Sequence, residues 1–241
     1  MINVSFKDFW PAVIEALETG IPYYESVGER ISLWHAQSAR RYAALKCEVQ
    51  PGMSVLDVGI GPGALSKIVL SRFKPGLFIG LDVSTKMLKV AAENLSRFYG
   101  SIQTVRGIFE KMPFREGSFD RVFSAFALED SPDRHSALRE FGRVCKRGGL
   151  LAIVNIGKSD NRVIRSAMAG YINFIMPTIA KLSILRKISG NPWRLLTIVY
   201  QNLPTNSLLK NEVKDTFGEA FLKKFMFGGI IVLWAKKKTL P

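Results

Sequence analysis

The sequence predicts an α/β fold organised around a parallel sheet. Between residues 51 and 157, short apolar runs alternate with segments in which apolar residues recur every three or four positions, the patterns of buried strands and amphipathic helices. The first apolar run leads into three closely spaced glycines, Gly59, Gly61 and Gly63. Alternating strands and helices predict parallel strands joined by right-handed crossovers. Such sheets bind ligands at the carboxyl ends of their strands, so we expect the functional residues there.

The chain of 241 residues fits one domain with additions at both ends of the core. The expected core strands are 53–58, 77–82, 101–106, 119–126 and 150–156, separated by helices at 66–73, 85–98 and 133–145. Outside the core we expect helices at 6–17, 30–47 and 211–217, and a terminal hairpin of 221–227 and 230–235, followed by a solvated lysine tail, Lys236–Lys238. The domain then divides into a helical cover (1–50), a ligand-binding core (51–157), a helical insertion or lid (158–205), and a C-terminal helix and β-hairpin (206–241).

The glycine turn is expected to hold a nucleotide-like ligand. Glycine tolerates the torsions of a tight turn and lets a ligand lie against the main chain. The spacing also fits a dinucleotide pattern, but Asp57, two residues before Gly59, would repel a pyrophosphate. A carboxylate there suits a ligand with an ammonium group and a sulfonium, as in S-adenosyl-L-methionine (SAM). Asp82 ends the next apolar run 19 residues after Gly63, about the distance at which an acid meets a ribose hydroxyl pair.

The composition is that of a globular protein, with 47% hydrophobic residues. Cys47 and Cys145 have neither a CxxC spacing nor a neighbouring histidine, so we expect reduced core cysteines in a cytoplasmic protein and no metal site. Residues 1–10 lack the long apolar region of a secretory signal.

Positive charge is concentrated in the last third of the chain. The formal net charge is +14, and residues 158–241 contain 14 basic and 4 acidic residues. A field of this sign attracts a nucleic acid or an anionic membrane surface. The alternative is a solvated basic face without a partner.

The insertion mixes apolar and basic residues and is expected to form two or three helices. The 15 residues between Arg165 and Lys181 are fewer than the ~20 that a membrane-spanning helix needs, so we expect no transmembrane helix. The insertion would then be a cover over the site, an interfacial element facing lipid headgroups, or part of the core wall.

Four stretches together resemble class I SAM-dependent methyltransferases. They are the glycine turn 57–63, the segment 81–88, the residues 110–114 with 118–120, and the region from 137 to Gly148-Gly149. Within that superfamily the sequence is most similar to the C-methyltransferases of menaquinone and ubiquinone biosynthesis, on residues 31–35 with Arg40-Arg41, 175–177 and 228–232. The resemblance implies a Rossmann-like, seven-stranded class I methyltransferase sheet, SAM as cofactor and S-adenosyl-L-homocysteine as product.

The resemblance also implies a set of cofactor contacts. Asp57, Gly59 and Gly61 would contact the methionine end of SAM, with Gly63 completing the turn. Asp82 would bind the ribose hydroxyls and Met87 would pack near the adenine. The cofactor positions that depart from the family pattern are Ile108 and Phe109, where an Asp or Asn before a small residue is usual and only a backbone contact to adenine remains, and Ala125, where a serine is common.

Glu129 and Asp130 are the expected catalytic residues. They follow the fourth predicted strand, where the quinone enzymes usually have Arg-Asn, and a carboxylate there could remove a phenolic proton from an acceptor. Asp130 could instead cap the helix that Pro132 opens. His35, in the N-terminal cover, is a further candidate, whereas His135 is expected at the surface.

These observations predict a SAM-dependent methyltransferase acting on a small lipophilic acceptor, with a ring carbon of a demethylated quinol as the first choice. We expect a cytoplasmic enzyme with peripheral contact at the inner face of an anionic membrane. Two alternatives stay open, an RNA methyltransferase that uses the basic C-terminal part and a non-catalytic SAM-binding subunit.

Overall fold

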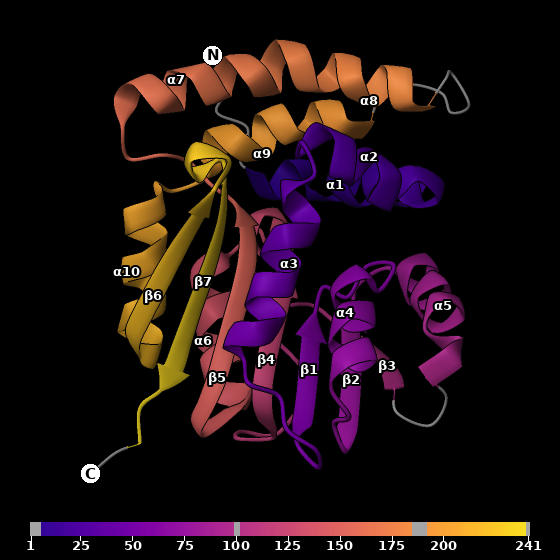
Figure 1. Ribbon diagram of the computed structural model, residues 1–241, viewed down its shortest axis with the longest axis vertical. Coiled ribbons are helices and arrows are strands. Elements are labelled where there is room, and N and C mark those ends of the chain that lie inside the picture. The colour runs from indigo at the N-terminus through magenta and orange to yellow at the C-terminus, as the bar shows by residue number, and fades with distance from the viewer. Residues whose placement is uncertain (1–5, 99–101, 185–191, 240–241) are drawn as a thin grey trace.

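Within the described residues, seven strands form a single sheet with helices on both faces (Figure 1). The computed structural model describes residues 6–98, 102–184 and 192–239. The strand order is β3-β2-β1-β4-β5-β7-β6; β7 pairs antiparallel with β5 and β6, and the other pairings are parallel. This order confirms the predicted Rossmann-like, seven-stranded sheet. The strands are β1 (Ser54–Val58), β2 (Leu77–Asp82), β3 (Ile102–Arg106), β4 (Phe119–Ala125), β5 (Cys145–Ile156), β6 (Gly218–Phe225) and β7 (Ile230–Lys237).

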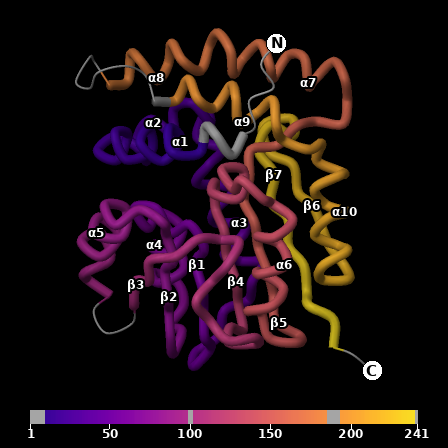
Figure 2. Tube along the Cα trace, turned by 180° about the vertical axis from the view of Figure 1, so that it is seen from behind, coloured from indigo at the N-terminus to yellow at the C-terminus, as the bar shows by residue number. Residues whose placement is uncertain are grey.

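Five helices cover the two faces of the sheet and bury two apolar cores. The helices α3 (His35–Lys46), α4 (Ala64–Arg72) and α5 (Thr85–Asn94) lie on one face, and α6 (Arg134–Val144) and α10 (Asn206–Phe217) lie on the other (Figures 1 and 2). Phe78 and Phe123 are fully buried in the first core, and Phe141 and Phe217 in the second. Both faces are therefore covered, which explains why the central strands are mostly apolar.

A second group of helices forms a cap over the carboxyl ends of the parallel strands (Figure 1). The cap consists of α1 (Phe6–Gly20), α2 (Tyr24–Ile31), α7 (Arg162–Gly170), α8 (Met176–Ile184) and α9 (Leu196–Asn202). Val27 of α2, Ala180 and Ile184 of α8, and Trp193 share a small buried cluster. The predicted cover and insertion thus pack against each other, over the edge where ligands of such sheets bind.

The predicted helix 30–47 is wrong at its start, because the chain turns sharply between α2 and α3. Leu33 and Trp34 have φ angles of 49° and 61°, which end a helix. The Ser32 hydroxyl accepts a hydrogen bond from the Ala36 amide at 3.1 Å, at the beginning of α3. The apolar residues keep their helical spacing through this turn, so the sequence pattern does not indicate it.

The length argument against a membrane-spanning helix is also wrong. A π-helical turn, η4 (Tyr171–Ile175), joins α7 to α8 into one helix of 23 residues, Arg162–Ile184. Arg165 and Lys181 lie inside this helix and do not bound it. By length and composition alone the helix could cross a membrane, and it lies across the cap, packed on α2 (Figure 1).

The C-terminal hairpin is longer than predicted. Lys236 and Lys237 belong to β7, and the Lys237 ammonium donates to the Cys145 carbonyl at 2.9 Å, so these two lysines are not a free tail. The exposed Lys223 and Lys224 lie on the edge strand β6, where charge opposes edge-to-edge aggregation. Part of the basic excess therefore protects a sheet edge.

Candidate active site

The glycine turn between β1 and α4 is pinned to β2. The backbone amides of Gly59 and Ile60 both donate to the Leu81 carbonyl, at 2.8 and 3.0 Å. A Cβ on Gly59, where φ is 70°, would lie 2.4 Å from the Cβ of Ala127. A Cβ on Gly61 would meet nothing within 4 Å among the described residues. The turn is thus tightly packed at Gly59 and open at Gly61, where a ligand can lie against the main chain.

Gly63 has a different position from the one predicted. It is the residue before α4, with φ of 90°, and a Cβ there would lie 2.9 Å from the Leu95 side chain. Gly63 is not among the described residues that line a cavity of the site. It fixes the turn into α4.

Asp57 and Asp82 place two buried carboxyl groups on either side of the turn. Asp57 is 1% exposed and accepts a hydrogen bond from the Ser66 hydroxyl at 2.6 Å. Burial raises the pKa of Asp57 to about 7. Asp82 accepts from the amides of Gly61 and Ser84 at 2.9 and 3.0 Å, and burial raises its pKa as well. Both carboxyl groups would gain from a ligand that brings a positive charge or hydroxyl donors.

Two connected hollows surround the turn. The larger, the cofactor cavity, comprises about 580 Å³ of space, part of it open to solvent, and is lined by Asp82, Met87, Ile108 and Phe109. The smaller, the turn pocket, lies beside Asp57 and Ala125, and both hollows are lined by Gly59 and Gly61. The structure therefore brings together every predicted cofactor residue except Gly63.

The N-terminal helix α1 closes over the cofactor cavity. Trp10, Ile14 and Leu17 of α1 line it. Glu18 accepts a hydrogen bond from the Ser84 hydroxyl at 2.6 Å and pairs with Lys86 at 2.8 Å, so α1 is tied to the start of α5. The sequence predicted a cover here but not this polar connection.

A third hollow, the acceptor cavity, adjoins the other two. It encloses about 790 Å³ of space, part of it open to solvent, between α1, α2, α3 and the insertion. Its walls are mainly apolar, and they include Val13, Leu17, Ile156, Trp193, Leu196 and Val199. Tyr24 lines all three hollows, and Asp130 and Phe126 line both the acceptor and the cofactor cavity. These three residues mark the place where a cofactor and an acceptor would meet.

Glu129 and Asp130 supply the acidic groups of the acceptor cavity. Glu129 is 7% exposed, and its Oε2 atom is buried without a hydrogen-bond partner among the described residues. Burial, followed by the neighbouring charge of Asp130, raises the pKa of Glu129 well above its ordinary range. Burial also raises the pKa of Asp130, to about 7. A buried carboxyl group with an unused acceptor atom indicates a functional site more than a structural one.

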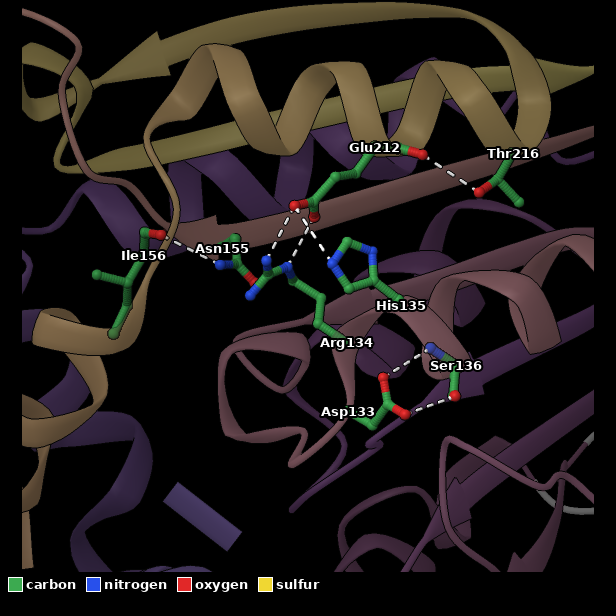
Figure 3. A network of polar contacts seen from close by, with 8 residues as sticks. All are labelled: Asp133, Arg134, His135, Ser136, Asn155, Ile156, Glu212 and Thr216. Carbon is green, nitrogen blue, oxygen red and sulfur yellow. Dashed lines mark hydrogen bonds and ion pairs between the residues drawn. The ribbon is translucent and has the colours of Figure 1, made fainter. Parts of the chain in front are cut away.

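The capping role considered for Asp130 belongs to Asp133. The Asp133 carboxylate accepts from the Ser136 amide at 3.1 Å and the Ser136 hydroxyl at 2.7 Å (Figure 3). Asp130 ends the preceding turn, η3 (Leu128–Asp130). Asp130 is therefore free of the helix end and borders the cavity.

The segment that follows the two acids is anchored to α10. Arg134 makes two hydrogen bonds to Glu212, at 2.7 and 2.9 Å, and His135 lies 3.9 Å from the same carboxylate (Figure 3). The His135 side chain is 62% exposed, consistent with the expected surface position. This bidentate pair holds the start of α6, and with it the turn that carries Glu129 and Asp130.

Arg40 entered the sequence analysis only through the family resemblance, and its place in the site was not predicted. It is 7% exposed, donates to Glu29 at 3.1 Å, and its guanidinium lies 4.9 Å from the centre of the Phe126 ring. Phe126 has a φ of 55°, a strained value that functional sites often contain. His35, by contrast, is not among the described lining residues of the three hollows, so the structure does not bring it to Glu129.

The site fits SAM. The buried carboxyl group of Asp57 lacks a cationic partner within hydrogen-bond distance among the described residues, and the ammonium of SAM would supply one. Asp82 keeps acceptor positions for the ribose hydroxyls, and the apolar Met87 and Phe109 offer a surface for the adenine.

The fold and the site together define a class I SAM-dependent methyltransferase, with SAM as its cofactor. The sequence matches the methyltransferase domain family over residues 56–153. It is 30% identical over 197 residues to the ubiquinone/menaquinone biosynthesis C-methyltransferase UbiE of Ectopseudomonas mendocina, covering 80% of this chain and 76% of that protein. It is 34% identical over 162 residues to the demethylmenaquinone methyltransferase of Oceanobacillus iheyensis, covering 66% and 68%. The chain belongs to this family of ubiquinone/menaquinone biosynthesis C-methyltransferases.

The fold is also found in distant solved structures. A SAM-dependent methyltransferase from Thermotoga maritima superposes with a TM-score of 0.61 at 17% identity, covering 93% of this chain and 99% of that one. At this identity the likeness concerns the fold alone.

Proposed function

We propose that this enzyme transfers a methyl group from SAM to a ring carbon of a demethylated quinol. One observation carries the proposal: the buried carboxyl group of Glu129 and the half-buried one of Asp130 lie in the wall of a mainly apolar cavity that adjoins the cofactor cavity. An apolar cavity suits a lipophilic ring, and the acids suit the phenolic protons of a quinol. The names of the relatives, which are quinone-biosynthesis C-methyltransferases, support the same acceptor class.

In the proposed mechanism, the carboxylate of Glu129 takes a phenolic proton, which makes the neighbouring ring carbon nucleophilic. The raised pKa of Glu129 brings its proton affinity closer to that of a phenol than an exposed glutamate would have. When bound, SAM supplies an electrophilic methyl group whose leaving group is a neutral thioether. Asp130, at the border of the two cavities, receives the proton that the methylated ring carbon loses when the ring becomes aromatic again.

Tyr24 and Phe126 would align the acceptor and exclude water. Both line the passage between the cavities, and methyl transfer depends mainly on in-line positioning of the two reactants. An RNA acceptor fits this arrangement less well, because α1 and α2 cover the cavity and leave little room for a polynucleotide.

Because a lipophilic acceptor is dissolved in the membrane, we infer that this cytoplasmic enzyme makes peripheral contact with the membrane. Cys47 and Cys145 are both buried free thiols, which suits a reducing compartment.

The test is methyl transfer from SAM labelled in its methyl group to reduced demethylated quinols with short prenyl chains. We expect a labelled lipophilic product that has gained a ring methyl group and lost a ring proton in its NMR spectrum. An O-methyl ether as the product would overturn C-methylation. Labelled RNA from a parallel reaction would favour the RNA alternative, and SAM binding without transfer to any acceptor would favour a non-catalytic subunit.

A further inference from the structure

We propose that the end of the molecule formed by the long cap helix docks on an anionic membrane surface. The docking face comprises the outer side of α7, η4 and α8 and two turns beside them, with the apolar residues Leu33, Trp34, Val163, Phe174, Ile175, Leu182 and Phe227. This proposal rests on the proposed function in one respect: docking would give the enzyme access to an acceptor dissolved in lipid.

Exposed apolar side chains are concentrated at this end. Of the eleven large apolar side chains that are exposed among the described residues, these seven lie on the long helix or the two turns. The long helix lies at the top of Figure 1. Phe174 is 75% exposed, Leu182 69% and Phe227 83%. Single exposed apolar residues are ordinary, but a group of this size at one end marks an interaction surface.

The long helix is apolar on both its inner and its outer side. Its inner side buries four residues at a spacing of four, Ile172, Met176, Ala180 and Ile184. Packing on the cap therefore accounts for the inner side only. The outer side carries the exposed Phe174, Ile175 and Leu182 together with polar residues, a pattern typical of a helix that lies in a membrane interface.

Two strained turns hold further apolar side chains beside this helix. Leu33 and Trp34 follow Ile31, whose carbonyl accepts a hydrogen bond from the Tyr171 hydroxyl of η4 at 2.8 Å. Phe227 belongs to the turn η6 (Met226–Gly228) before Gly229.

Gly229 ties the second turn to α7, because a Cβ there would lie 2.3 Å from the Met168 side chain. Leu33, Trp34, Met226 and Phe227 all have φ angles between 48° and 61°, an unfavourable region for these residue types. Each turn thus keeps an aromatic ring in solvent at a conformational cost, as expected where the ring has a function. Trp34, 66% exposed, is of the residue type enriched at membrane interfaces.

The charge of the surrounding chain selects an anionic lipid surface as the partner. Between residues 158 and 184 there are four basic residues, Lys158, Arg162, Arg165 and Lys181, and one acid, Asp160. Arg162 and Lys181 are exposed near the two ends of the long helix, where they can reach headgroups. Arg186 and Lys187 follow in the sequence.

The docking face lies over the acceptor cavity. Ala180 and Ile184, on the inner side of the same helix, pack with Trp193, which lines that cavity. Docking in this orientation would place the cavity between the lipid surface and the cofactor, so that a lipophilic acceptor has a short path into the site.

The test is flotation of the full-length protein with vesicles of phosphatidylcholine alone or mixed with phosphatidylglycerol, in the absence of any acceptor. We expect binding to the anionic vesicles, weaker binding to the neutral ones, and loss of binding as salt is added. Phe174→Ser and Leu182→Ser should each weaken binding by about threefold or more. The control Leu45→Ser removes an apolar side chain of α3 that is 46% exposed and lies outside the docking face, and it should have no effect.

A charge comparison provides a second arm. Lys181→Glu should weaken binding to anionic vesicles, whereas Lys67→Glu, at an exposed position of α4, should change it less. Brominated lipids should quench the fluorescence of the wild type more than that of Trp34→Phe. Equal binding by the Phe174, Leu182 and Leu45 variants, or no vesicle binding at all, would overturn the proposal.

Sedimentation velocity tests the alternative that a second copy of this chain covers the docking face. If Phe174→Ser converts a dimer into a monomer, the face joins two copies of the chain and the membrane proposal fails. Vesicle binding without methylation of any quinol would instead refute the proposed acceptor and leave the docking face intact.

Discussion

The Ser84 hydroxyl donates to the Glu18 carboxylate at 2.6 Å and accepts from the Met87 amide at 3.2 Å. One side chain therefore caps α5 and ties the N-terminal helix to the cofactor-binding half of the domain. Hydrogen bonds from Lys86 and Ser84 hold the pKa of Glu18 below its usual range. The Glu18 carboxylate is therefore fully ionised at neutral pH.

Glu18→Gln should loosen the closure of α1 over SAM. We expect SAM to bind about threefold to tenfold more weakly, mainly through faster dissociation, because a charge-assisted hydrogen bond and an ion pair are lost. Stopped-flow displacement and calorimetry measure the two effects. Glu15→Gln, at an exposed position of the same helix, should leave SAM binding unchanged, and an equal effect of both variants would refute the role of the connection.

Asp57 should make the stability of the SAM-free protein fall with rising pH. Because its pKa is about 7 in the folded state and about 4 in an unfolded chain, the folded protein holds the proton more tightly than the unfolded chain. The corresponding stability is fully present below about pH 4 and is lost as pH rises through about 7. Asp57→Asn removes this titration, so the wild type should lose on the order of 2–4 kcal/mol relative to the variant across that window.

Urea denaturation at a series of pH values measures this difference, and parallel stability curves for the two proteins would contradict it. SAM should reverse the effect, because a cation beside Asp57 favours the charged carboxylate. Calorimetry near pH 6 in buffers of different ionisation enthalpy should show proton release when the wild type binds SAM, and little release for Asp57→Asn.

Asp82→Ala should weaken SAM binding by about tenfold or more, because it removes the acceptor expected for the ribose hydroxyls. Calorimetry measures the affinity, and circular dichroism checks that the fold persists. Asp215→Ala, at an exposed position of α10, is the matched control. Wild-type affinity in Asp82→Ala would show that the ribose lies elsewhere.

Gly59→Ala and Gly61→Ala should separate packing from binding. In Gly59→Ala the new methyl group would overlap Ala127, so we expect a loss of about 2–4 kcal/mol of folding free energy. In Gly61→Ala the surroundings are open, so the loss should be about 1 kcal/mol, while SAM affinity should fall by at least about tenfold. Thermal denaturation and calorimetry compare the pair. Gly170→Ala, in open space inside the long helix, should leave SAM affinity unchanged and raise the folding free energy by up to about 1 kcal/mol.

Glu129→Gln should slow methyl transfer by about a hundredfold or more, because general base catalysis is worth roughly that factor. SAM affinity should stay near that of the wild type. Single-turnover rates over a range of pH measure the effect, and Glu93→Gln, at an exposed position of α5, is the control. A rate for Glu129→Gln equal to that of the control would transfer the role of base to Asp130, for which Asp130→Asn is the next variant.

Much of the fold and of the cofactor site could be predicted because the signals are local. The glycine turn, Asp57 and Asp82 belong to single strand–turn–helix segments, whose periodicity and glycine spacing are visible in the sequence. Parallel strands then bring these segments to one edge of the sheet, which is why Met87 and Phe109 also line the cofactor cavity.

Apart from Glu129 and Asp130, the acceptor side could not be predicted, because it is formed by tertiary packing. Tyr24 belongs to no motif and Arg40 only to the family resemblance, and both reach the site only because the N-terminal cover packs on the insertion. Asp130 and Asp133 illustrate what sequence alone cannot decide, because both precede α6 by only a few residues. The η3 turn decides which of them caps it.

The position of β7 also bears on how the protein is synthesised. β7 is the last strand in the chain, yet it lies between β5 and β6 and pairs with both along its length. On the ribosome, β5 keeps an open edge until β7 has emerged. Chains that end before Ile230 would expose this edge, so they should be captured by chaperones or degraded.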